Sequence, residues 1–157
     1  MRINLFIREI PQRPNHGLSA QLYVQALVIC KFPLVEKAIN FLVDTGASYT
    51  TILDKDAKRL GIDYRDLEPK TKEDWARGVG GAVETYIMRD VQLKFLSDDR
   101  REVLFERTLP QVHVLKHPKE MYEQVREMPS LLGMDFLRDF YMVVDVANGV
   151  AYLEPRA

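Results

Sequence analysis

The sequence predicts a mostly β fold with short helices. Runs of β-branched and apolar residues recur along the whole chain, turn-forming residues separate them, and only brief stretches carry helix signals. At 157 residues the chain suits one domain that can bury a core without disulfide bonds. We therefore expect a single β-rich domain with its own hydrophobic core.

The first part of the chain is expected to supply strands. The segment "RINLFIREI" predicts a first strand, and "PQRPNHG" at 11–17 is rich in turn formers and predicts the loop after it. Residues 20–29 and 37–43 are rich in β-branched and apolar side chains, and Pro33 between them suits a connection. We expect these two segments to pair as neighbouring strands.

A short helix is predicted next, in "LDKDAKRLGI". Asp54 stands where an N-cap carboxylate would accept backbone N–H bonds, and Gly61 stands where a glycine would end the helix. The segment therefore predicts a short connecting helix.

The second half predicts long strands with one helical excursion. Residues 71–96 alternate in polarity after a glycine-rich stretch and predict a long hairpin, and 101–115 continue as strand. Residues 118–128 begin with proline and contain good helix formers. The segment 129–155 predicts a short buried strand, a helical turn and two strands around Asn148-Gly149, a strong signal for a two-residue hairpin turn.

Composition excludes several classes of partner. The formal net charge is −1 with charges of both signs interspersed, so no basic face is available for nucleic acid. No run approaches the roughly 20 apolar residues of a membrane span, and the start of the chain lacks a signal-peptide pattern. The single cysteine, Cys30, lies in an apolar run and has no partner within the chain. We expect a soluble cytoplasmic protein without nucleic-acid or membrane partners.

One stretch, "INFLVDTGASYTTILD" at 39–54, carries a candidate site. An apolar strand ends in Asp44, Gly46 lets the chain turn back where a Cβ would clash, and Thr45 and Ser48 offer hydroxyls to the turn. Taken alone, such a motif more often marks an aspartate that only anchors its turn. Its interpretation depends on what accompanies it.

Two further stretches favour a catalytic interpretation. Leu42-Val43-Asp44-Thr45-Gly46-Ala47-Ser48 resembles the catalytic loop of the retropepsin-like aspartic proteases, and "LLGMDFL" contains Leu131-Leu132-Gly133, similar to the segment packed behind that loop. The resemblance covers most of residues 20–154. It implies a single-lobe, pepsin-related β-barrel with short helices and its active site at a homodimer interface. Residues 20–157 would form the protease domain, and residues 1–19 an N-terminal strand and loop that could reach the interface.

The resemblance also implies roles for individual residues. Asp44 would be the catalytic carboxylate, Thr45 would bond across to a partner loop, and Gly46 would border the substrate. Ala47 and Ser48 would also contact substrate. The stretch "RGVGGAV" at 77–83 looks like the flap tip of the family, although an ordinary hairpin turn explains it about as well when taken alone. The flap would bind substrate through Gly78, Val79, Gly80 and Gly81.

The implied chemistry needs two carboxylates that share one proton, one acting as base toward water and the other as acid toward the scissile carbonyl. The chain has one Asp-Thr-Gly, and Asp135, Asp139 and Asp145 are interpreted as helix-surface or strand-end carboxylates. The second aspartate would come from a second copy of the chain, with an extended peptide as substrate. No cofactor is expected.

Several alternatives remain open at this point. A fold kept only for peptide binding or dimerisation, with weak or no proteolysis, fits the same motif. A phosphate loop of actin-like ATPases also matches Asp44, Gly46 and Thr50, but the chain is too short for two nucleotide-binding lobes. Trp75 and Tyr86 either line the cleft or pack in the core. A metal site at His113 and His117 is not expected, because Pro118 and the strand-like pattern oppose a shared helical face.

Overall fold

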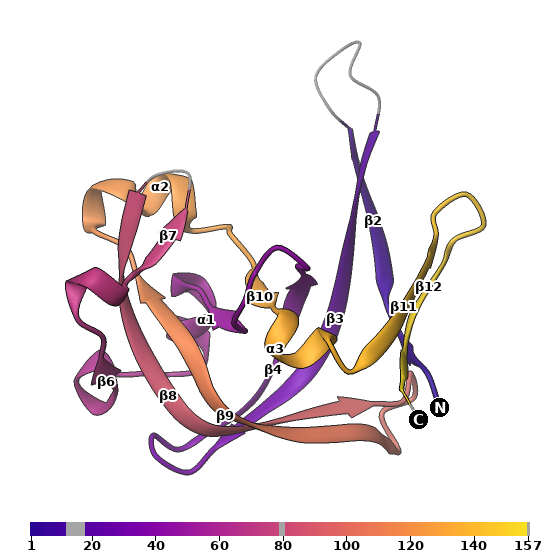
Figure 1. Cartoon of the computed structure of the whole chain (residues 1–157), viewed down its shortest axis with the longest axis horizontal. Coiled ribbons are helices and arrows are strands. Elements are labelled where there is room, and N and C mark those ends of the chain that lie inside the picture. The colour runs from indigo at the N-terminus through magenta and orange to yellow at the C-terminus, as the bar shows by residue number, and fades with distance from the viewer. Residues whose placement is uncertain (12–17, 79–80, 157) are drawn as a thin grey trace.

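The computed structural model describes residues 1–11, 18–78 and 81–156 and shows a mostly β protein, as predicted (Figure 1). Its helices are short, and none in the described ranges is long and apolar enough to cross a membrane. The strands are β1 (Ile3–Asn4), β2 (Phe6–Pro11), β3 (Leu18–Cys30), β4 (Val35–Val43), β5 (Thr51–Ile52), β6 (Glu68–Pro69), β7 (Ala76–Gly78), β8 (Gly81–Leu96), β9 (Val103–Lys116), β10 (Ser130–Leu132), β11 (Phe140–Asp145) and β12 (Val150–Pro155). The helices are α1 (Asp54–Arg59), α2 (Tyr122–Val125) and α3 (Met134–Leu137), with 3-10 turns η1 (Tyr64–Asp66), η2 (Lys72–Asp74) and η3 (Lys119–Met121).

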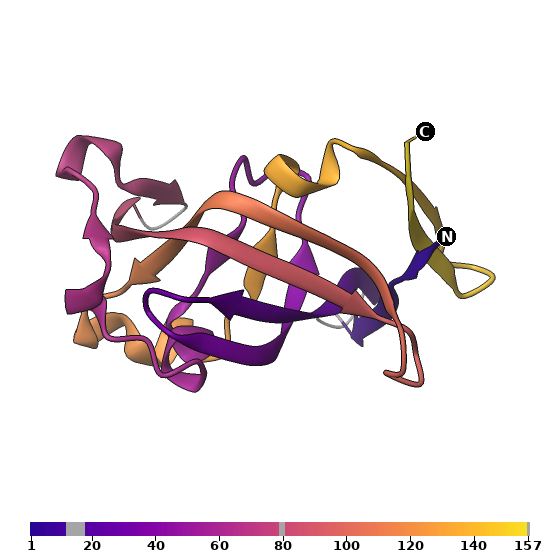
Figure 2. The same cartoon turned by 90° about the horizontal axis from the view of Figure 1, so that it is seen from below.

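The main sheet closes into a barrel. Strand β3 pairs antiparallel with β4, as predicted, and also with β8, so the path β3-β4-β10-β5-β9-β8 returns to its start. Strands β8 and β9 form its longest pair and run together across the molecule (Figure 2). A separate sheet of order β1-β12-β11 lies at one end, beside both termini (Figure 1).

The core follows from alternation along the strands. In β3 the side chains of Val24, Ala26, Val28 and Cys30 are all at most 3% exposed, whereas the residues between them are only partly buried. Every second side chain of a strand points to the same face, so this pattern fills the barrel interior. Cys30 therefore packs as a small apolar residue, and its thiol lies 3.4 Å from the Arg89 carbonyl oxygen.

The N-terminal and C-terminal strands are paired within one chain. Strand β1 pairs with β12, with Ile3 opposite Leu153, and β2 pairs along β3. One edge of β1 is thus used within the chain, and the expectation that residues 1–19 reach a subunit interface stays a prediction. The turn between β11 and β12 also has four residues rather than two, with Gly149 at φ +67°.

Helix α1 forms where predicted, but it begins differently. Its N-cap residue is Leu53, without a side-chain cap, and Asp54 is its first residue. The prediction of an Asp54 N-cap is wrong, because this carboxylate instead accepts hydrogen bonds from His117 on another segment. Gly61 does end the helix: it has φ +71°, and Ile62 N–H donates to the Ala57 carbonyl oxygen.

Candidate active site

Asp44 lies at the end of β4, where the chain leaves the barrel wall and returns as β5. Strand β10 fits between these two strands, parallel to β4 and antiparallel to β5. It places Leu131 beside Leu42 and Leu132 beside Val43. The Asp44 N–H donates to the Leu132 carbonyl oxygen at 3.0 Å. The ends of β4, β5 and β10 therefore meet at one point, and the half-buried Asp44 lies at this point.

The turn after Asp44 is closed by the aspartate itself. Its Oδ1 accepts the Gly46 N–H at 2.9 Å, and its carbonyl oxygen accepts the Ala47 N–H. A Cβ on Gly46 would lie 3.2 Å from Oδ1, so the glycine permits this close approach. The predicted use of the Thr45 and Ser48 hydroxyls to bond the turn is wrong for the described chain, where neither makes a hydrogen bond and both side chains are exposed. Thr45 is therefore available for an external partner.

Gly133 is the point of closest contact beneath this loop. A Cβ there would lie 2.6 Å from the Tyr49 carbonyl carbon and 2.9 Å from the Ala47 carbonyl oxygen. The residues after it bond the loop from below: Met134 N–H donates to Ala47 O at 2.8 Å, and Asp135 N–H to Ser48 O at 3.1 Å. Backbone contact this close leaves room for glycine alone.

Thr50 and Asp135 lock the loop from the side. The Thr50 hydroxyl donates to Asp135 Oδ1 at 2.8 Å and accepts the Gly133 N–H at 3.2 Å. The Thr50 N–H also donates to the Asp135 carboxylate at 3.0 Å. The interpretation of Asp135 as a helix-surface carboxylate is therefore wrong. Asp139 pairs with Arg107 at 2.9 Å, and Asp145 ends β11, as expected of surface and strand-end carboxylates.

The predicted flap is an antiparallel hairpin of β7 and β8. Arg77 pairs with Ala82 and Gly78 with Gly81, which has φ +101°. Val79 and Gly80 lie outside the described residues. The base is tied by Thr85, whose buried hydroxyl donates to Val83 O and accepts the Ala76 N–H, both at 2.8 Å.

A groove of about 740 Å³ lies between the Asp44 loop, this hairpin and the segment after β9. Gly46, Ala47 and Ser48 line it, although Asp44 itself does not. The hairpin and α2 face each other on the same side of the molecule (Figure 1). Further lining residues include Gly78, Gly81, Val83, His113, His117, Met121, Val125, Met128 and Leu131. The structure therefore brings the predicted loop, flap and supporting residues around one groove.

The two aromatic side chains left open by the sequence do not line this groove. Tyr86 packs beside Tyr64, with ring centroids 5.1 Å apart, and its hydroxyl bonds the Glu84 carboxylate. Trp75 donates its indole N–H to the Lys70 carbonyl oxygen at 3.2 Å. Both contribute to packing around the hairpin base.

His113 borders the groove in an unusual state. Its ring stacks on Tyr49 at 4.4 Å, and its buried Nε2 has no hydrogen-bond partner among the described residues. Burial, assisted by the positive charge of Lys70, lowers the pKa of His113 from 6.5 to about 4, against an opposing effect of Asp135. The ring is therefore neutral at pH 7. No group of three or more potential metal ligands is found in the described ranges.

His113 should make stability depend on pH. Between its folded pKa of about 4 and the ordinary 6.5, the unfolded chain binds the extra proton, so the free energy of unfolding rises with pH. This stabilisation is complete above 6.5 and lost as the pH falls toward 4. We expect His113→Phe, which keeps the stacking, to reduce the slope of the free energy of unfolding against pH. The loss corresponds to at most one bound proton, or about 1.4 kcal/mol per pH unit. Urea unfolding at pH 4.5, 5.5 and 7.5 measures it, and equal slopes in both proteins would contradict the assignment.

The fold is that of a retropepsin-like aspartic protease. Its defining features are a closed β-barrel, an Asp-Thr-Gly loop that packs against Leu-Leu-Gly, and a hairpin with Gly78 and Gly81 that faces this loop. The profile of gag-polyprotein putative aspartyl proteases matches residues 34–139, and the chain belongs to this family. No curated protein matches the sequence.

Three solved structures are similar to the chain. A retropepsin-like aspartic protease from Rickettsia conorii is similar over 95% of this chain and 92% of that chain, with 24% identity and a TM-score of 0.51. EIAV protease, complexed with the inhibitor HBY-793, is 20% identical over 82% of this chain and 93% of its own, with a TM-score of 0.46. The retroviral protease-like domain of Ddi1 from Leishmania major is 16% identical over 86% and 94%, with a TM-score of 0.48.

Proposed function

We propose that the protein is an aspartic endopeptidase that hydrolyses peptide bonds with a water molecule activated by two Asp44 carboxylates, one from each subunit of a homodimer. The observation that carries this proposal is the setting of Asp44. It is half-buried on a crossing of three backbone segments, and among the described residues only Gly46 donates to its carboxylate. A carboxylate held this firmly with one oxygen left open suits a reactive group.

The reaction follows from two such carboxylates in contact. Two like charges a few ångströms apart cannot both ionise, so the pair holds one proton. The ionised Asp44 takes a proton from the water molecule while the water oxygen forms a bond to the scissile carbonyl carbon. The protonated Asp44 donates its proton to the carbonyl oxygen. When the carbon–nitrogen bond breaks, the Asp44 that took the proton from water gives it to the leaving amine, and the other Asp44 takes a proton back from a hydroxyl of the diol, which becomes the carboxylic acid. The step needs no cofactor.

The second carboxylate is best supplied by another copy of the chain. Asp135 is committed to Thr50, and Asp139 to Arg107. The strand β11 and its turn expose apolar side chains on both faces, which suits an interface with a second subunit. Residues 1–19 would reach this interface through β1, which borders β12. The exposed apolar side chains are Tyr141, Met142, Val143 and Val144 on β11 and Val146 in the turn, followed by Val150 at the start of β12.

An extended peptide suits the groove as substrate. Gly46, Ala47 and Ser48 would bond its backbone from one side, and the hairpin tip from Gly78 through Val79 and Gly80 to Gly81 from the other. Alternate side chains of such a peptide would enter opposite walls of the groove. The buried free thiol of Cys30 agrees with a cytoplasmic, reducing location, which we also propose.

Peptide-library cleavage and sedimentation on the same purified protein test the proposal. We expect a dimer at tens of micromolar, roughly the range in which weak dimers form, with peptidase activity that falls on dilution and is blocked by pepstatin. Activity from a strict monomer would overturn the shared site. A dimer that binds peptides without cleaving any between pH 3 and 8 would instead support the alternative, a catalytically weak or inactive peptide-binding or dimerisation module.

A further inference from the structure

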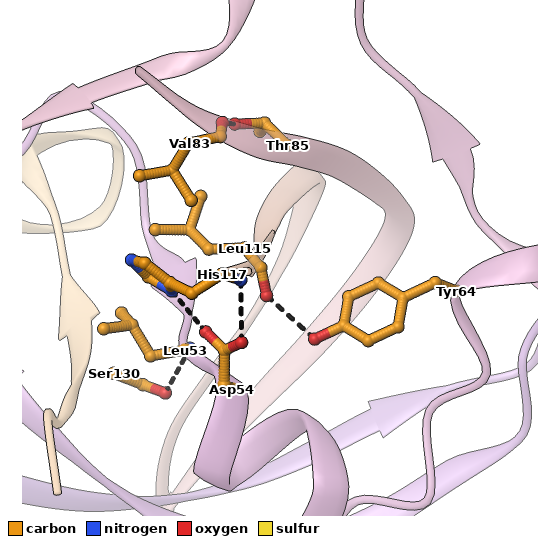
Figure 3. A network of polar contacts seen from close by, with 8 residues as sticks. All are labelled: Leu53, Asp54, Tyr64, Val83, Thr85, Leu115, His117 and Ser130. Carbon is orange, nitrogen blue, oxygen red and sulfur yellow. Dashed lines mark hydrogen bonds and ion pairs between the residues drawn. The ribbon is translucent and has the colours of Figure 1, made fainter. Parts of the chain in front are cut away.

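An aspartate–histidine pair stands in the wall of the groove. Asp54, the first residue of α1, accepts the His117 backbone N–H at 2.8 Å, and its other oxygen lies 2.6 Å from His117 Nδ1 (Figure 3). The His117 side chain is 6% exposed and that of Asp54 is 19% exposed. Because both carboxylate oxygens are engaged, Asp54 fixes the ring and places the hydrogen on Nδ1.

The other ring nitrogen of His117 points the opposite way. In the part of the chain that the structure describes, Nε2 makes no hydrogen bond, and unlike His113 Nε2 it is not fully buried. Figure 3 shows it on the side toward which Leu53, Val83 and Leu115 also project, and all four residues line the groove. His117 Nε2 is therefore a single polar atom of fixed orientation among apolar side chains of the groove.

The surroundings define what fits there. The groove runs on from His117 to the proposed catalytic loop at Gly46, and Met121, Val125 and Met128 from the helical excursion line it too. Methionine side chains adapt to the shape of a guest. An apolar side chain gains by filling this space, but it leaves Nε2 without a partner once water is displaced.

Resting on the proposed function, we propose that His117, oriented by Asp54, is a specificity-determining residue that selects tyrosine in the substrate. The aromatic ring of tyrosine would contact Leu53, Leu115 and the excursion, and its hydroxyl would meet Nε2. A hydroxyl can donate to the neutral ring and accept from the protonated one, so the contact persists in either state. Phenylalanine would fill the same space and leave the nitrogen unpaired.

Matched peptides that differ only by Tyr or Phe at successive positions test this inference. We expect kcat/KM for tyrosine to exceed that for phenylalanine about tenfold at one position, a factor that corresponds to about 1.4 kcal/mol. In His117→Phe the ratio should fall to near one, and His117→Gln, which restores a hydrogen-bonding group, should recover part of it. His113→Phe is the matched control and should keep the preference. Equal cleavage of both peptides at every position, or loss of the preference only in His113→Phe, would overturn the inference.

Binding separates this subsite from catalysis. Fluorescence anisotropy of the same labelled peptides on the Asp44→Asn protein requires no turnover, and we again expect about tenfold tighter binding of the tyrosine peptide. A protein that cleaves nothing but shows this preference would refute the proposed function and retain the subsite. Equal affinities, or no binding of either peptide, would refute the subsite.

Discussion

An Asp44→Asn protein is expected to lose peptidase activity while keeping its fold and its association. Asparagine has nearly the same shape, and its side-chain oxygen can still accept the Gly46 N–H, but it cannot accept a proton from water. If each site uses one Asp44 from each subunit, a mixed dimer is inactive. At fixed total protein, activity should then fall as the square of the wild-type fraction, leaving about a quarter after equal mixing and full exchange.

The mixing experiment separates two arrangements of the site. A chain that carried a complete site of its own would lose activity linearly, with half remaining after equal mixing. Subunit exchange should be shown independently by mass spectrometry of differently labelled chains. A linear decline with proven exchange would rule out the shared carboxylate pair and return Asp44 to the role of a turn anchor.

Gly133→Ala is expected to be the most destabilising substitution near the site. The added Cβ would lie 2.6 Å from the Tyr49 carbonyl carbon and 2.8 Å from its oxygen, and backbone atoms cannot rotate away as a side chain can. To relieve this steric clash, the Asp44 loop would have to move away from Met134 and Asp135, and their backbone hydrogen bonds to the loop would be lost. We expect a loss of about 3 kcal/mol or more, the upper end for overpacked sites, and a melting temperature lower by roughly 6–12 °C.

Gly78→Ala provides the matched control, because no atom of the described residues lies within 4 Å of a Cβ there and Gly78 has no positive φ. Its melting temperature should stay close to that of the wild type. Thermal unfolding followed by circular dichroism compares the two variants. Equal, small shifts would show that the loop tolerates a Cβ beneath it, and the crossing would then be looser than the structure indicates.

The sequence predicted the strands well because apolar alternation and turn residues are local signals. The region around Asp44 was predictable through the resemblance to the retropepsin-like proteases, in which a segment similar to Leu131-Leu132-Gly133 packs behind the catalytic loop. The functions of Asp54 and Asp135 were not, because both depend on partners far along the chain. An aspartate at a helix start usually caps the helix, and nothing near Asp54 indicates that His117 competes for its carboxylate.

The same limit applies to the groove wall. The spacing of His113 and His117 opposes a shared helical face, but it carries no information about what each ring contacts. Their neighbours Tyr49 and Asp54 flank β5, which pairs directly with β9 in the barrel but lies far from it in the sequence. Only the closed fold shows that two imidazoles line the groove beside the Asp44 loop.

The insertion of β10 between β4 and β5 sets when the site can form during folding. Its register places Leu131 beside Leu42, so the crossing beneath Asp44 joins segments that are widely separated in the chain. Contacts of this kind require a large loop-closure entropy before they contribute stability, and they form slowly, on a scale of milliseconds to seconds. We therefore expect a partly folded chain to lack an ordered Asp44 loop, and the proposed proteolysis to begin only after the barrel is complete.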